Sequence, residues 1–138
     1  MRPLSRIEKQ WLEECILNYK NYDREINLRK LELLEKRENL TPEIQRQAGI
    51  TNHNEQDMVK LLDDPYIQQQ ERFKKAVTET AEALPSEPAH LMHLRFKERP
   101  YEDTWEVFTE DLYCSKHKIY KMRDEILQCY AKHINYLR

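Results

Sequence analysis

The sequence predicts an all-α protein in which long N-terminal helices precede a C-terminal helix-turn-helix domain. The 138 residues include a single glycine, and 35% of them are charged, which is typical of long solvent-exposed helices. No run alternates apolar and polar residues in the manner of a β-strand. Apolar residues recur at helical spacing instead, and they suggest four segments: 1–40, 41–65, 66–84 and 85–138.

The first segment is predicted to be a long helical arm, because residues 5–39 contain no proline or glycine. Apolar residues recur in it every seventh position, although polar residues occupy half of the second heptad position. Two interpretations stay open: the helix packs against its own chain, or it is an arm that dimerises or binds a partner. In the second case the oligomerisation residues are Leu12, Tyr19, Ile26 and Leu33, with Leu40 continuing the repeat.

The connector is predicted to contain a short helix that starts at Thr41-Pro42 and ends near Gly49. A polar loop over 49–54 and a turn of helix over 57–62 follow it. Acidic residues and Pro65 then start a second long helix over about 66–84, because negative charge stabilises a helix N-terminus. Pro85 ends this helix.

The last segment has the pattern of a helix-turn-helix. A supporting helix over 87–98 is followed by a connection over 99–101, a positioning helix over 104–112 and a recognition helix from Ser115. Trp105, Phe108 and Leu112 recur at helical spacing in the positioning helix, and Ser115 offers an N-cap hydroxyl. The buried stripe of the recognition helix is expected to be Ile119, Met122, Ile126, Tyr130 and Leu137.

Charge is distributed unevenly along this segment, although the whole chain has a formal net charge of −2. Residues 98–111 hold one basic and six acidic residues, whereas residues 115–138 hold six basic and two acidic residues. The positive charge therefore lies on the expected recognition helix, where attraction to phosphate requires it. Double-stranded DNA is the expected partner.

The first two turns of the recognition helix supply the candidate contacts to bases and phosphates. An exposed helix N-terminus at Thr104 is expected to hold a phosphate. The alternative is that the lysines form an ordinary solvated face. The candidate DNA-binding residues are Thr104, Ser115, Lys116, His117, Lys118, Tyr120, Lys121 and Arg123.

The C-terminal region resembles the DNA-binding region four of sigma factors and, more closely, phage transcriptional regulators of the RinA/ArpU type. These regulators have a W-E-x-I-A-x-x-L stretch before an S-x-x-x-Y-Y-R-x-R-D segment. The likeness is specific over about residues 84–130 and loose elsewhere. The matching residues are Trp105, Glu106, Phe108 and Leu112 in the first stretch, and Ser115, Tyr120, Lys121, Arg123 and Asp124 in the second.

The resemblance implies a phage or prophage activator of late genes, acting in the cytoplasm of a bacterial host. In such a regulator the N-terminal helices would either set the oligomeric state or contact bacterial RNA polymerase, and a homodimer would suit a pseudo-palindromic operator. The chain departs from the family pattern at Thr109, where alanine is usual, and at Tyr113, where the turn has glycine. The competing interpretation is a helical protein–protein interaction module, either a polymerase-binding adaptor or an anti-regulator, without direct DNA binding.

No enzyme, cofactor, small-molecule substrate, metal or membrane is expected. A chain with one glycine has no glycine-rich phosphate loop, and no apolar run approaches the length of a membrane span. Its three cysteines show no paired spacing, which fits a reducing compartment. Cys114, His117, Cys129 and His133 have zinc-like spacing, but one helix would hold the two cysteines about 22 Å apart.

Overall fold

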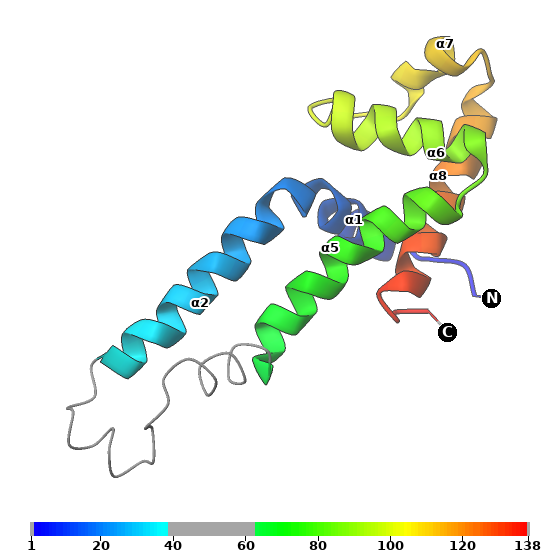
Figure 1. Cartoon of the computed structure of the whole chain (residues 1–138). Coiled ribbons are helices and arrows are strands. Elements are labelled where there is room, and N and C mark those ends of the chain that lie inside the picture. The colour runs from blue at the N-terminus through cyan, green and yellow to red at the C-terminus, as the bar shows by residue number, and fades with distance from the viewer. Residues whose placement is uncertain (1, 39–62, 138) are drawn as a thin grey trace. The chain divides into compact units, whose positions relative to one another are not determined.

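The computed structural model describes residues 2–38 and 63–137, and within these ranges it is helical with no strand. The all-α prediction is therefore confirmed for the described residues. No helix in this part of the chain is long and apolar enough to span a membrane. The helices are α1 (Arg6–Leu17), η1 (Asn18–Asn21), α2 (Tyr22–Glu38), α5 (Pro65–Ala83), α6 (Ser86–His93), η2 (Leu94–Glu98), η3 (Glu106–Phe108), α7 (Thr109–Leu112) and α8 (Lys116–His133) (Figure 1).

The chain forms two compact units. Unit 1 consists of Met1–Tyr19 together with Phe73–Arg138, and unit 2 consists of Lys20–Arg72. The chain thus divides near residues 19 and 72, whereas the sequence predicted boundaries at 40, 65 and 84. Helix α1 belongs with the C-terminal helices, because it packs against α8.

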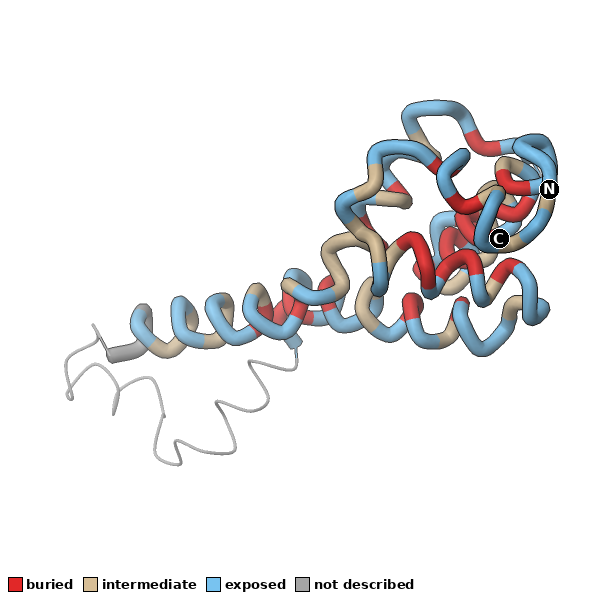
Figure 2. The backbone as a smooth tube through the Cα atoms, turned by 90° about the horizontal axis from the view of Figure 1, so that it is seen from above, coloured by how far each residue is buried: buried red, intermediate tan, exposed pale blue. Residues whose placement is uncertain are grey.

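The core of unit 1 is built around α8, which contacts both α1 and α6. Buried residues are red along the backbone in Figure 2. The predicted apolar stripe of α8 is confirmed, because all of its members are less than 9% exposed. Leu137 reaches this core after the helix has ended at His133, through a reversal at Asn135 with φ of 63°. Trp105 and Phe108 belong to the segment that includes η3, and they complete the core with exposed fractions of 4% and 0%.

A polar cluster lies among these apolar residues. The Trp105 indole donates a hydrogen bond to Glu13 Oε1 at 3.0 Å. The guanidinium of Arg95 lies 5.4 Å from the Phe96 ring centre and 5.6 Å from the Trp105 ring centre, and it donates to the Pro100 carbonyl at 3.2 Å. Burial raises the pKa of the Glu13 carboxyl, despite the hydrogen bond from Trp105 and the charge of Arg95.

Helix α1 begins with a capping box, in which Ser5 Oγ accepts a hydrogen bond from the Glu8 amide and Glu8 accepts one from the Ser5 amide. The predicted single helix over 5–39 is wrong, because the 3-10 segment η1 separates α1 from α2. Two asparagines border this segment, and asparagine side chains compete with helical hydrogen bonds. The buried side of α1 joins the core of unit 1, whereas Tyr22 and Ile26 of α2 are buried in unit 2.

Unit 2 has a small core of Tyr22, Ile26 and Ile67. Asp64 caps α5, because its carboxylate accepts a hydrogen bond from the Ile67 amide at 3.1 Å. The same carboxylate pairs with the Arg29 guanidinium at 3.1 Å, and this pairing holds the pKa of Asp64 below its ordinary value.

The predicted oligomerisation stripe is largely covered by the chain itself. Leu12 and Ile26 are 0% and 6% exposed, and Tyr19 packs against the core of unit 1. Leu33 is half-buried. This burial corresponds to the interpretation in which the helix packs against its own chain. Leu40, the helix expected from Thr41-Pro42, the loop over 49–54 and the turn over 57–62 lie outside the described residues.

Candidate nucleic-acid interface

A tight turn joins α7 to α8. Tyr113 adopts the left-handed conformation, with φ of 50° and ψ of 48°, and its side chain is 95% exposed. The amide of Cys114 donates to the Thr109 carbonyl at 3.2 Å, which closes the end of α7. A left-handed conformation at a non-glycine residue such as this tyrosine costs about 1 kcal/mol.

Ser115 starts α8 as its N-cap, as the sequence predicted. Its backbone is extended, with φ of −75° and ψ of 158°, and its Oγ accepts a hydrogen bond from the Lys118 amide at 3.2 Å. Such a cap typically stabilises a helix by about 1 kcal/mol. The cap fixes where α8 begins, and so it fixes which side chains of the first two turns point outward.

The first two turns of α8 present two different sides. Ile119 and Met122, 0% and 4% exposed, anchor one side in the core. The predicted contact residues on the other side are exposed, except for Tyr120, which is half-buried; they are Lys116, His117, Lys118 and Lys121. The structure thus brings most of the predicted contact residues to one accessible surface.

Glu106 of η3 ties two of these residues together. Its Oε1 lies 3.0 Å from Lys116 Nζ and accepts a hydrogen bond from the Tyr120 hydroxyl at 2.9 Å. These contacts lower the pKa of the Glu106 carboxyl and raise that of the Lys116 ammonium. Burial and the nearby Glu106 raise the pKa of Tyr120. The start of α8 is therefore joined to η3 by polar contacts as well as by the core.

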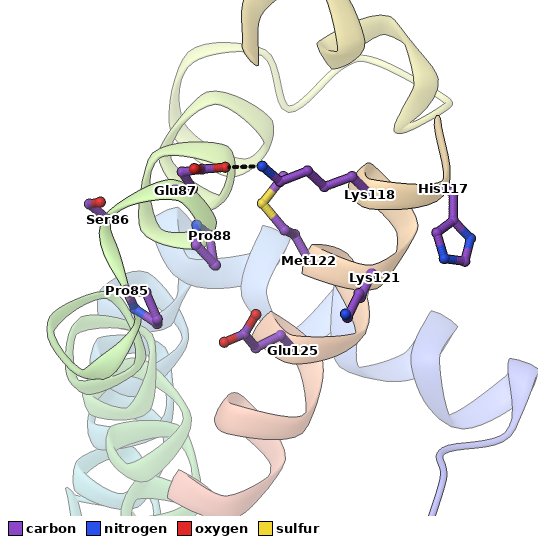
Figure 3. Close-up of a pocket in the computed structure, with 9 residues that line it drawn as sticks. All are labelled: Pro85, Ser86, Glu87, Pro88, His117, Lys118, Lys121, Met122 and Glu125. Atoms are coloured by element: carbon purple, nitrogen blue, oxygen red, sulfur yellow. Dashed lines mark ion pairs between the residues drawn. The ribbon is translucent and has the colours of Figure 1, made fainter. Parts of the chain in front are cut away.

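A pocket of about 530 Å³ lies between the start of α6 and α8. Lys118 reaches across it to Glu87 of α6, with 2.7 Å between Nζ and Oε2 (Figure 3). Lys121 and Glu125 line the same pocket, and the His117 ring points away from Glu87 (Figure 3). In the described part of the chain, neither His117 nor Lys121 forms an ion pair.

Arg123 is held against its own helix. Its guanidinium lies 4.9 Å from the centre of the Tyr120 ring and pairs with Asp124 at 3.1 Å. Asp124 also pairs with Lys9 of α1, at 3.1 Å. Only 21% of the Arg123 side chain is exposed, so a contact with the DNA backbone would require it to leave these partners.

Thr104 does not begin a helix, which corrects the prediction for residues 104–112. The first helical residue is Glu106, and the segment consists of the 3-10 turn η3 and the single α-helical turn α7. The Thr109 hydroxyl donates to the Glu106 carbonyl at 2.9 Å, which holds the two turns together. Thr104 is exposed before η3 and lies at no helix N-terminus.

The roles of Glu87 and Glu106 were not predicted from the sequence. Both acids pair with lysines of α8 that lie ten or more positions later in the chain. The unequal charge of residues 98–111 and 115–138 indicated that acidic and basic residues could pair, but it did not indicate which acid pairs with which lysine.

The four residues with zinc-like spacing lie near the two ends of α8. Cys129 Sγ is 3.7 Å from His133 Nδ1, which also lies 2.8 Å from the Cys129 carbonyl oxygen, and Cys114 precedes the start of the helix. Among the residues that the structure describes, no three histidine, cysteine, aspartate or glutamate side chains are grouped to hold a metal ion.

A protein-family model matches most of the chain. Residues 9–132 match the family described as "Protein of unknown function (DUF722)". Because this match spans most of the 138 residues, the chain belongs to the DUF722 family. No curated protein and no solved structure matches the chain.

Proposed function

We propose that the protein is a sequence-specific DNA-binding transcriptional regulator that inserts α8 into a major groove. In this proposal η3 and α7 are the positioning element of a helix-turn-helix, and the left-handed turn at Tyr113 leads into α8. One observation carries the proposal: an N-capped helix is anchored by its apolar side and presents lysines on the first two turns of its outer side. Lysines at these positions can pair with phosphates or donate hydrogen bonds to the acceptor atoms of guanine.

The biological setting is proposed from the resemblance to RinA/ArpU-type regulators. It suggests a phage or prophage activator of late genes, which acts in a bacterial cytoplasm and contacts RNA polymerase. The residues of that resemblance include Trp105 and Ser115, which here close the core of unit 1 and cap α8.

Glu87 and Glu106 are proposed to compete with DNA phosphates for the lysines of α8. The Lys116–Glu106 and Lys118–Glu87 pairs are exposed, and exposed pairs contribute little stability. Phosphates can therefore replace the two carboxylates at small cost. Lys121 and His117, which form no ion pair in the described chain, are available to DNA first.

A salt titration of DNA binding tests the proposal. The logarithm of the binding constant should fall steeply with the logarithm of salt concentration, because each phosphate contact releases counterions. Replacing Lys116, Lys118 and Lys121 together by alanine should reduce this slope by about 3. The control is the matched loss of three lysines elsewhere, Lys30, Lys75 and Lys97, which should leave the slope nearly unchanged. If the α8 variant binds with the slope of the unaltered protein, α8 is not the recognition helix and the interaction-module alternative gains support.

The competing carboxylates make a separate prediction. Glu87→Gln and Glu106→Gln together should tighten DNA binding several-fold, because two lysines lose their partners within the chain and two nearby negative charges disappear. Glu110→Gln removes an exposed charge close to the same turn, and it serves as the control. Equal affinities of the double variant and this control, measured by fluorescence anisotropy, would contradict the competition.

A further inference from the structure

Helix α2 carries apolar side chains on two opposite faces. Successive residues of an α-helix are rotated by about 100°, so positions 24, 28, 31 and 35 lie within about 60° of one another. Leu28 and Leu31 on this face are 52% and 56% exposed. Tyr22 and Ile26, on the opposite face, are 1% and 6% exposed. The face with Leu28 and Leu31 is therefore separate from the one that packs within unit 2.

Two opposite charges border the exposed leucines. Arg24 precedes Leu28 by four residues, and Glu35 follows Leu31 by four residues. Both charged side chains are exposed, and neither has an ion-pair partner in the described part of the chain. We call Arg24, Leu28, Leu31 and Glu35 the α2 stripe.

The α2 stripe is complementary to itself when its direction is reversed. A two-fold axis placed between Leu28 and Leu31 brings each Leu28 opposite the partner's Leu31. The same axis brings each Arg24 opposite the partner's Glu35. One symmetric operation thus covers both apolar residues and pairs both charges, which is what an isologous interface requires.

We propose that α2 pairs antiparallel with α2 of a second copy of the chain through the α2 stripe. The 17 residues of α2 span about 25 Å, so a single helix pair is a small interface. A small interface is expected to give a weak dimer that depends on protein concentration. The proposal does not depend on DNA binding, and it places the dimer on a different face from Leu12 and Ile26, which are buried in the chain.

Sedimentation equilibrium of the full chain tests the pairing. The average mass should rise from the monomer value of 16.9 kDa toward twice that value as the concentration rises from about 1 µM to about 1 mM. Arg24→Glu and Glu35→Arg should each abolish this rise in mass. In a dimer of either variant, positions 24 and 35 carry like charges, and the two-fold axis creates two such repulsive pairs. The double variant Arg24→Glu/Glu35→Arg should restore the rise.

An equal mixture of the two single variants gives the sharpest result. Each variant alone repels itself, but the mixed pair sets glutamates against arginines at both ends, so only the mixture should form dimers. Arg72→Glu on α5 makes the same charge change at another exposed position and should dimerise like the unaltered chain. Circular dichroism should report equal helix content for all of these variants, because the substituted side chains are exposed.

Two results overturn the proposal. A chain that stays monomeric over the whole concentration range does not use the α2 stripe for a second copy. Single charge variants that dimerise as well as the unaltered chain show that the dimer forms elsewhere. Neither result bears on DNA binding by α8.

Discussion

The two units of this protein are stabilised in different ways. Unit 1 buries a continuous set of hydrophobic side chains from α1, α5, α6, η3 and α8. Among the described residues of unit 2, only three hydrophobic side chains are buried, and polar contacts such as Arg29–Asp64 accompany them. Apolar burial stabilises by roughly 25 cal/mol per Å², so unit 1 has the larger share of the stabilising free energy.

The comparison predicts which unit unfolds first. Segments with few buried apolar contacts open at lower free energy than the core does. Unit 2 should therefore lose its helices before unit 1. The two units can be followed separately, because both tryptophans of the chain, Trp11 and Trp105, lie in unit 1. Tryptophan fluorescence reports on unit 1, whereas circular dichroism reports on the helices of both units.

The largest expected effect is in unit 1. Phe108→Ala removes a ring that is 0% exposed, and it should lower the free energy of unfolding by about 3–5 kcal/mol. Urea unfolding followed by tryptophan fluorescence measures the loss. Val107→Ala, at a neighbouring side chain that is 37% exposed, is the control and should change stability little. Equal midpoints for the two variants would mean that Phe108 does not support the core.

The second effect tests the independence of unit 2. Ile67→Ala truncates one of the three buried hydrophobic side chains that the structure describes in unit 2, at a cost of about 2–5 kcal/mol for a well-packed site. Helix content should therefore fall at low urea, while the fluorescence transition stays at the concentration of the unaltered chain. Tyr66→Ala, at a side chain that is 42% exposed, is the control. A fluorescence transition that moves together with the loss of helix would show that the units unfold as one.

A smaller effect is expected at the cap of α5. Asp64→Ala removes both the helix cap and the partner of Arg29, and it should destabilise unit 2 by about 1–2 kcal/mol. Asp64→Asn keeps an acceptor for the cap and should lose less. Because the folded state holds the pKa of Asp64 below its ordinary value of 3.8, its contribution is present above that pH. The contribution should disappear as the pH falls through the lowered pKa, which circular dichroism at several pH values measures.

The smallest effect concerns Glu13 in the core of unit 1. Burial raises its pKa above the ordinary value of 4.5, so the folded state is favoured while the carboxyl is protonated. That stability is present below pH 4.5 and is lost as the pH rises through the raised pKa. Glu13→Gln keeps an acceptor for the Trp105 indole without the buried charge, and it should raise the urea midpoint at pH 7 but not at pH 4. A variant that is less stable at pH 7 would show that the charges of Glu13 and Arg95 stabilise each other more than burial costs.

The elements with local signals were predictable from the sequence. The buried stripe of α8 and the cap at Ser115 follow from residue spacing and from a hydroxyl before a helix, so both were predicted correctly. The left-handed conformation of Tyr113 has no such local signal, because tyrosine does not favour it.

Long-range features were not predictable. No proline or glycine marks the break at η1. The break lies where the buried side chains change from the core of unit 1 to the core of unit 2. The pairing of Glu87 and Glu106 with lysines of α8 depends on tertiary packing, which a single sequence does not encode in its local pattern. The same is true of the contact between α1 and α8.

The contact between Glu13 and Trp105 sets a time scale for the synthesis of this protein. The two residues are separated by 92 positions, and translation at about 5–20 residues per second needs about 5–20 s to cover them. During that interval the apolar side of α1 cannot pack against α8, because α8 has not yet been made. Unit 2 lies wholly within the interval and can form its helix pair first. The less stable unit is thus the first to be complete, and the more stable one is the last.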